Sequence, residues 1–256
     1  MSAVAILAGG GVGTAIRLGT SMMLLQFAIG ALNDIVDAPA DAGRRPPKVI
    51  PAGLIRPGQA RVVVAVSAAL GLALALASGP AVLAVAIAVL GIGAVYDLAA
   101  KGTPWSWLPF AVGIPILPVY GWLGATGSLT VGLAVLVPMA FLAGAALAIA
   151  NARSDVDADT RSGTTSVATA LGSERSWWIG TALMVAATVI GLVFVGQAGW
   201  SPMTRALVAT GTAIVMGGLL MGRSMAAAWR RRAWELQAIG VAIAATGWVA
   251  GLIPGP

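Results

Sequence analysis

Cysteine and histidine are both absent from the 256 residues of this chain. Their absence excludes disulfide bonds, catalysis by a thiolate or an imidazole, and zinc sites of the usual composition. A metal ion would have to be bound through oxygen atoms, which favours Mg²⁺ or a similarly hard cation.

Charged residues are also scarce, since they make up 9% of the chain, whereas hydrophobic residues make up 59%. Soluble domains usually carry roughly 25% charged residues. The sequence does not alternate between apolar and polar residues over segments of ~10 residues, as a membrane β-barrel requires. We therefore predict an all-α, polytopic membrane protein in a lipid bilayer.

The basic residues that give the chain its formal net charge of +6 are spread over the segments between apolar runs. They form neither a basic domain nor a patch with interleaved aromatic residues, so no nucleic acid partner is expected. The N-terminal sequence MSAVAILAGGG has no positively charged region, and we do not interpret it as a cleaved signal peptide.

A membrane-spanning helix requires about 20 mostly apolar residues. Eight such segments are predicted near residues 14–36, 61–78, 81–98, 105–124, 130–152, 176–197, 203–222 and 234–253. A further apolar piece, residues 3–12, is too short to span by itself and is expected to be a half helix or a truncated first span. We predict one transmembrane domain over residues 1–256, with eight to nine helices.

The segments between the predicted spans alternate between charged and uncharged. One side carries the polar segments 37–60, 97–104, 153–175 and 223–233, and it holds every Lys and Arg except Arg17 and Arg205. The bias of Lys and Arg assigns that side to the cytoplasm. All nine acidic residues lie there too, and because acidic residues count little in that rule, their clustering requires a functional explanation.

Two acidic clusters share the spacing N-x-x-x-D-x-x-x-D, each at the downstream end of a long apolar segment. The clusters consist of Asn33, Asp37 and Asp41, and of Asn151, Asp155 and Asp159. Carboxylates that face one another at a membrane repel strongly unless a cation separates them. Mg²⁺ usually takes one or two protein carboxylates per ion, together with water and phosphate oxygens. We therefore predict that all six residues bind Mg²⁺ ions, two or more of which clamp a diphosphate.

The two clusters are expected to differ in shape. Residues at i, i+4 and i+8 share one face of a helix. Pro39 interrupts the first cluster and favours a helix end there, with Asp41 on a loop turned back toward the site. The second cluster contains no such residue, and its helix is predicted to run to about Arg161 and to end at Gly163.

Basic residues near the clusters are candidates for binding the diphosphate. They are Arg45, Lys48, Lys101 and Arg161, and Arg44 is a candidate that could take the place of Arg45. Each could instead be a solvated loop charge that only sets the topology.

The acidic motifs resemble those of the UbiA superfamily of intramembrane prenyltransferases. The family's first motif is similar to NDIVDAPAD at residues 33–41 followed by KVIPAG at residues 48–53. Its second motif is similar to DVDADTRSG at residues 155–163 with Thr165 or Ser166 following, and the Tyr and Lys between the motifs match Tyr96 and Lys101. Asp34 and Asp157 lie off the main face of their clusters and are secondary candidates for the site.

This resemblance implies Mg²⁺-dependent transfer of a prenyl group from an isoprenyl diphosphate to an aromatic, quinone-precursor-like or other lipophilic acceptor. It implies catalytic roles for Asp37, Asp41, Asp155, Asp159 and Tyr96, the last contacting the diphosphate or shielding the allylic cation.

The chain departs from the family pattern in three places. Only 32 residues precede Asn33, so the first helix is expected to be short or missing. Position 48 is Lys where Arg is common, and Thr164 and Thr165 stand where many relatives carry a Lys.

Three alternatives stay open. A non-aromatic lipid or a sugar phosphate could be the acceptor of the same reaction. A cation-coupled transporter would place its carboxylates near the bilayer midplane rather than at one face. A CDP-alcohol phosphotransferase would carry its aspartates in one stretch beginning D-G-x-x-A-R, which the chain lacks.

Overall fold

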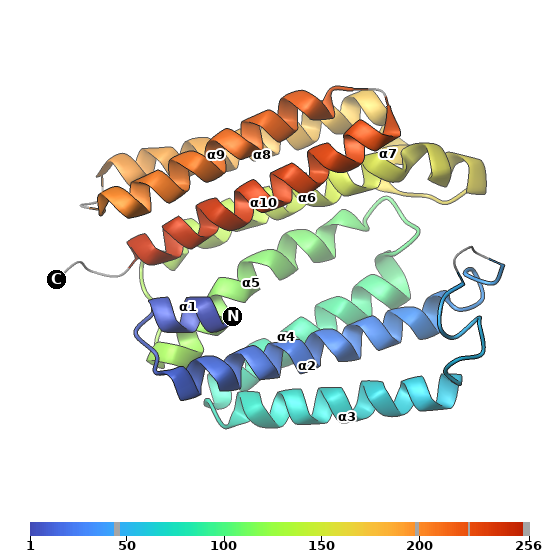
Figure 1. The fold of residues 1–256 in the computed structure, drawn as a ribbon, viewed down its shortest axis with the longest axis horizontal. Helices are drawn as coiled ribbons and strands as arrows, with labels where there is room; N and C mark the ends of the chain where they lie inside the picture. The colour runs from blue at the N-terminus through green and yellow to red at the C-terminus, as the bar shows by residue number, and fades with distance from the viewer. Residues whose placement is uncertain (44–46, 198–199, 225, 253–256) are drawn as a thin grey trace. The chain divides into compact units, whose positions relative to one another are not determined.

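The computed structural model of the chain describes residues 1–43, 47–197, 200–224 and 226–252. Throughout these residues the regular secondary structure is helical (Figure 1). The predicted all-α class is therefore confirmed.

Eight segments are long and apolar enough to cross a membrane. Seven of them are formed by α2 (Val12–Asp37), α3 (Pro57–Leu76), α5 (Trp107–Thr126), α6 (Leu133–Ser162), α8 (Ser173–Gln197), α9 (Pro202–Gly222) and α10 (Ala227–Gly251). The eighth joins α4 (Pro80–Val95) to the π-helical turn η1 (Tyr96–Ala100). Each span overlaps one predicted from the sequence, and the chain is a multi-pass membrane protein.

Two further helices are short. The helix α1 (Ser2–Leu7) occupies the apolar piece that was expected to be a half helix, and α7 (Val167–Leu171) follows the second acidic cluster. Several long helices begin at a proline, namely Pro57, Pro80 and Pro202. Proline suits the first helical position because its missing N–H would have no intrahelical partner there.

The largest difference from the predicted boundaries is at α10. This helix begins at Ala227, seven residues before the predicted 234. Its first turns contain Arg230, Arg231 and Arg232, which hydropathy excludes from a span although arginine is a good helix former. The helix therefore carries its charges beyond the apolar segment.

The chain divides into two compact units, residues 1–99 with 120–127, and residues 100–119 with 128–256. The expectation of one domain over residues 1–256 stays a prediction. In the first unit α2 packs against α1, α3 and α4. Buried Ser21 of α2 donates to the carbonyl of Gly71 at 2.7 Å and accepts from the hydroxyl of Tyr120 at 2.7 Å. Arg17, an exception to the charge bias, donates from Nε to Ser78 Oγ at 2.9 Å.

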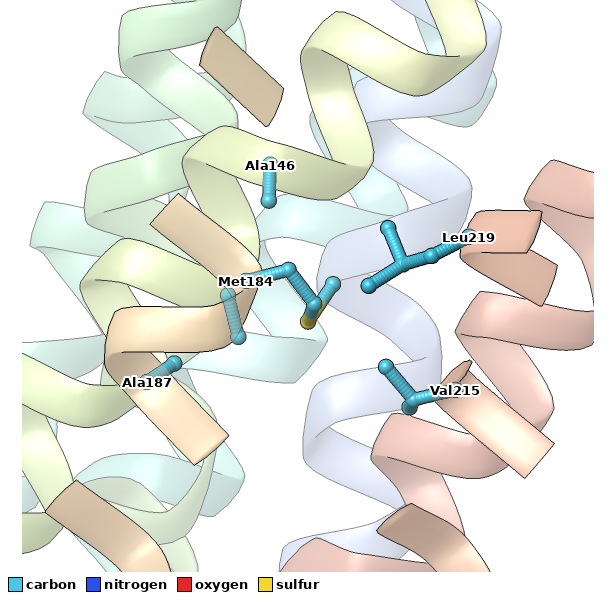
Figure 2. Close-up of a cluster of buried hydrophobic side chains, with 6 residues drawn as sticks. Ala146, Met184, Ala187, Val215 and Leu219 are labelled. Carbon is cyan, nitrogen blue, oxygen red and sulfur yellow. The ribbon is translucent and has the colours of Figure 1, made fainter. Parts of the chain in front are cut away.

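The second unit has α6 packed against α8 and α10, and α10 packed along α9. Its core contains alanines of α6 and α8 and larger apolar residues of α8 and α9, namely Ala143, Ala146, Ala187, Met184, Val215 and Leu219. Figure 2 shows Met184 pointing from α8 toward Val215 and Leu219. The small side chains on α6 let these longer ones fill the interior, as is common in membrane helix packing.

Glycine allows α9 and α10 to approach closely. A Cβ added at Gly240 would lie 2.7 Å from the carbonyl oxygen of Gly211, and one at Gly211 would lie 2.5 Å from the backbone nitrogen of Ala244. The two backbones are therefore nearly in contact, and no larger residue fits without separating the helices.

The neighbouring glycines of α9 give a matched test of this packing. We expect Gly218→Ala to lower the free energy of unfolding by about 1–3 kcal/mol, as overpacking does, because its Cβ would lie 2.9 Å from the carbonyl oxygen of Ala233. Gly217→Ala should be neutral or stabilising, since a Cβ there meets nothing within 4 Å. Thermal unfolding of both variants in detergent measures the difference, and equal stabilities would contradict the close approach.

Candidate functional site

The first acidic cluster surrounds one ammonium group. Lys48 Nζ lies 2.7 Å from Asp41 Oδ2, 3.7 Å from Asp37 Oδ2 and 3.9 Å from Asp34 Oδ1. Asp41 is buried, Asp37 is partly buried and Asp34 is more exposed. The carboxylates thus converge on one cation. Asp34, a secondary candidate in the sequence, belongs to this group.

The end of α2 brings these carboxylates together. The helix ends at Asp37, two residues before Pro39, as the sequence predicted. The chain then makes a turn in which the amide of Asp41 donates to the carbonyl of Asp37 at 2.9 Å. Asp41 therefore stays one turn beyond Asp37 even though the regular helix has ended, and both carboxylates reach Lys48.

The charges around Lys48 change its acidity. Its pKa lies above the usual value for lysine, chiefly because its ammonium donates a hydrogen bond to Asp41. Burial acts in the opposite direction, and the charges of Asp41, Asp37 and Asp34 add to the increase. Lys48 therefore stays protonated at neutral pH and balances part of the negative charge of the cluster.

A buried carboxylate of the π-helical turn holds the side chain of Asn33. Asn33 Nδ2 donates to Asp97 Oδ1 at 2.8 Å, and Asp97 is buried. Because a carboxylate only accepts hydrogen bonds, this contact fixes which end of the amide faces Asp97. The amide oxygen of Asn33 is therefore directed away from Asp97, the orientation that an oxygen ligand to a metal ion would need. Turns of this π-helical kind often occur at functional sites.

The second cluster lies on the last turns of α6. The helix continues to Ser162, and Gly163 follows with φ of 71°, as the sequence predicted. In this left-handed conformation, which glycine adopts without steric cost, the backbone turns so that the amide of Thr164 donates to the carbonyl of Asp159 at 2.9 Å. Asp155 and Asp159 lie one turn apart on a continuous helix, unlike the helix end and turn of the first cluster.

Two arginines of α10 pair with aspartates in and beside this second cluster. Arg231 Nη2 lies 3.5 Å from Asp155 Oδ1, between two side chains that are both substantially exposed. Arg230 Nη2 lies 2.5 Å from Asp157 Oδ2, and the Arg230 side chain is buried. The early start of α10 is what brings both guanidinium groups to α6.

The hydroxyl residue after the second motif has a local structural role. Ser166 caps α7, because its hydroxyl accepts from the amide of Thr169 at 3.3 Å and Thr169 Oγ1 accepts from the amide of Ser166 at 2.8 Å. Such a capping box satisfies two amides that the helix leaves without partners. Ser166 therefore fixes where the chain resumes after Gly163.

The other predicted site residues are placed as follows. Tyr96 begins the π-helical turn and is partly buried, Lys101 lies in the turn after it, and Arg161 is exposed in the last turn of α6. Asn151 lies one turn before Asp155 on α6. Arg44 and Arg45 lie outside the described residues. The roles assigned to all of these residues stay predictions.

Within residues 1–43, 47–197, 200–224 and 226–252, no three acidic side chains are arranged so as to hold a metal ion by themselves. Mg²⁺ does not need such a group, because it usually takes one or two protein carboxylates and fills its other positions with water or phosphate oxygens. The oxygen-only donors, and the ammonium group among three carboxylates, fit a hard cation that arrives with a phosphate ligand.

Three contacts were not predicted from the sequence. The sequence marks Asp97 only as one acidic residue of its loop, although its position at the end of an apolar span is a usable signal. In the sequence, Arg230 and Arg231 contribute only to the charge bias that sets the topology. Their pairing with Asp157 and Asp155 depends on the packing of α10 against α6, which a single sequence does not reveal.

Two comparisons with known proteins give matches, one in sequence and one in fold. The sequence model of the UbiA prenyltransferase family matches residues 1–250. No curated protein sequence gives a significant match.

Solved structures of similar fold cover nearly the whole chain. A structure from work on digeranylgeranylglyceryl phosphate synthase in membranes has a TM-score of 0.78 at 17% identity, over 98% of this chain and 92% of that one. A UbiA homologue from Aeropyrum pernix K1 gives 0.75 at 21% identity, over 96% and 93%. A homologue from Archaeoglobus fulgidus bound to GPP and Mg²⁺ gives 0.73 at 15% identity, over 98% and 94%. At these identities the comparison shows a common fold.

The contact between Asn33 and Asp97 can be measured by a double-mutant cycle. We expect Asn33→Ala and Asp97→Ala each to destabilise the protein, because a hydrogen bond to a charged group contributes about 1.5–3 kcal/mol. The double variant should lose at least about 0.5 kcal/mol less than the sum of the single losses, since the pair is coupled. Chemical unfolding in detergent gives the four free energies, and additive losses would contradict the contact.

Proposed function

Because the chain belongs to the UbiA prenyltransferase family, we propose that it catalyses the Mg²⁺-dependent transfer of a prenyl group from an isoprenyl diphosphate to a lipophilic acceptor, with release of diphosphate. The observation that carries this proposal is the convergence of three carboxylates on the ammonium of Lys48. Carboxylates gathered beside a bilayer in this way are suited to bind cations and, through them, an anionic substrate.

Mg²⁺, when bound, would stabilise the negative charge that develops on the departing diphosphate. We assign its protein ligands to the oxygens of the two acidic clusters, Asn33, Asp37, Asp41, Asn151, Asp155 and Asp159. The homologue structures support the binding of Mg²⁺ with a prenyl diphosphate, since those proteins bind GPP or DMAPP together with Mg²⁺. Asp97 supports the first cluster by fixing the amide orientation of Asn33.

The basic residues would bind the diphosphate oxygens. Lys48 is suited to this role because its protonated ammonium already lies among the carboxylates, so a metal–diphosphate complex would replace carboxylate contacts with phosphate contacts. Arg231 is a further candidate through its position beside Asp155, and it offers a cation near the motif in which Thr164 and Thr165 replace the Lys of many relatives. Arg44, Arg45, Lys101, Arg161 and Tyr96 keep their predicted roles.

The acceptor is proposed to be an aromatic, quinone-precursor-like molecule. A lipid alcohol or a sugar phosphate is the alternative, and the structural similarity to the protein from the digeranylgeranylglyceryl phosphate synthase work favours testing it. We also propose that both acidic clusters face the cytoplasm, because nearly all Lys and Arg residues lie on their side of the membrane.

The first test removes one carboxylate from each cluster. We expect Asp37→Ala and Asp155→Ala each to lower Mg²⁺-dependent release of pyrophosphate from a prenyl diphosphate by at least about 100-fold, a typical loss when one charge-stabilising group is removed. The assay uses purified protein in nanodiscs with C10 to C50 diphosphates and a panel of quinone precursors, sugar phosphates and lipid alcohols.

Glu235→Gln is the matched control for this test, because it removes an exposed carboxylate of α10 outside both clusters. It should keep full turnover, and all variants should keep the wild-type melting temperature within a few degrees. Undiminished turnover in either aspartate variant would overturn the assignment. Cation flux without pyrophosphate release would instead identify a transporter.

Two adjacent arginines allow the contribution of Arg231 to be separated from general charge. We expect Arg231→Gln to raise the KM for prenyl diphosphate about 10-fold, the effect of losing one charge-assisted hydrogen bond. Arg232→Gln should leave the KM unchanged, because Arg232 lies over the ring of Trp229 at 5.8 Å. Equal changes in the two variants would mean that Arg231 contributes only to the net charge.

A further inference from the structure

A small, partly open cavity lies in the second unit, between α6, α8, α9 and α10. Its volume is about 20 Å³. Its lining includes the side chains of two arginines, Arg153 and Arg230, together with Gln237, Thr181 and Ser176. The described residues that line the cavity include no aspartate or glutamate.

Both arginines are almost fully removed from solvent, with 5% of Arg153 and 3% of Arg230 exposed. Arg153 donates from Nε to the carbonyl of Ser173 at 2.7 Å and from Nη1 to the carbonyl of Gly222. Arg230 pairs with Asp157, whose side chain is 56% exposed. The two guanidinium charges also lie close enough to repel each other.

The neutral polar groups of the cavity add hydrogen-bond donors. Gln237 is only 4% exposed and lies two turns after Arg230 on α10. Thr181 Oγ1 is buried and has no hydrogen-bond partner within the part of the chain that the structure describes. Ser176 already donates to the carbonyl of Gly172 at 2.8 Å, so the hydroxyl of Thr181 and the amide of Gln237 are the neutral groups that could bind an occupant.

The size and charge of the cavity limit what it can contain. A buried water needs roughly 10–15 Å³, so the cavity has room for about one small species. Charges buried without compensation are strongly destabilising. Asp157 compensates Arg230, whereas among the described residues Arg153 pairs with carbonyl oxygens and with no carboxylate. We infer that the cavity binds one monatomic anion of the size of chloride, held by Arg153 and Arg230 with the help of Gln237 and Thr181.

This anion would act on the structure beneath the second acidic cluster. Arg153 connects α6 to the first residue of α8 and the last residue of α9, and Arg230 belongs to the same helix as Arg231. Neutralising the repulsion between the arginines would therefore stabilise the helix ends that carry Asp155 and Asp157. The inference does not depend on the chemistry proposed above.

The test measures halide-dependent stability of the purified full chain in detergent. Starting from gluconate salt at constant ionic strength, chloride or bromide should raise the melting temperature by about 2–4 °C in a saturable way, as expected for a ligand that binds only the folded state. Crystals grown in bromide should show an anomalous peak in the cavity. A water there without anomalous signal, or no halide-specific rise, would overturn the inference.

Two variants test whether the halide response comes from this cavity. Gln237→Glu places a fixed carboxylate in the cavity and should abolish the halide response. Thr181→Val, which removes the partnerless hydroxyl, should raise the half-saturating halide concentration several-fold, and it provides the test if the glutamate variant does not fold. Thr188→Val is the control, because Thr188 Oγ1 donates to the carbonyl of Met184 in the same helix and lines no part of the cavity. A wild-type halide response in both cavity variants would contradict the proposed site.

Discussion

A carboxylate beside a lipid bilayer is stable only when a positive charge or a hydrogen-bond donor compensates it, and this requirement organises the helix ends of the chain. In the first unit Lys48 supplies the charge for three aspartates. In the second unit Arg230 and Arg231 supply it for Asp157 and Asp155. Both arrangements keep acidic groups together that would otherwise repel, so they remain available to a cation that brings its own anion.

The two units meet this requirement by different means. In the first, the counter-charge comes from a loop that follows the cluster closely in sequence, so a short stretch of chain contains both partners. In the second, it comes from α10, about 75 residues further along, and the packing of α10 on α6 is needed to form the ion pairs. The second cluster therefore depends on the tertiary fold of its unit, whereas the first depends mainly on how α2 ends.

Much of this architecture could be predicted because membrane helices are long and apolar, and because proline and glycine mark their ends. The ends of α2 before Pro39 and of α6 at Gly163 followed from local rules. The partners of the clusters did not, because Asp97 and Arg230 reach their positions through a π-helical turn and a polar helix start that hydropathy does not detect. Helix ends are thus predictable from the sequence because proline and glycine determine the local backbone. The partners of the acidic clusters are not, because they depend on packing between helices.

The π-helical turn also limits how the sequence can vary. Such a turn usually represents one residue more than an α-helix would need, and each residue of an α-helix rotates the side-chain direction by about 100°. Removing a residue that precedes Asp97 in this segment would rotate its carboxylate away from Asn33, although Asn33 and Asp97 themselves would be unchanged. Chain length in this segment is therefore under the same constraint as residue identity, and a shortened homologue would need another residue to orient that asparagine.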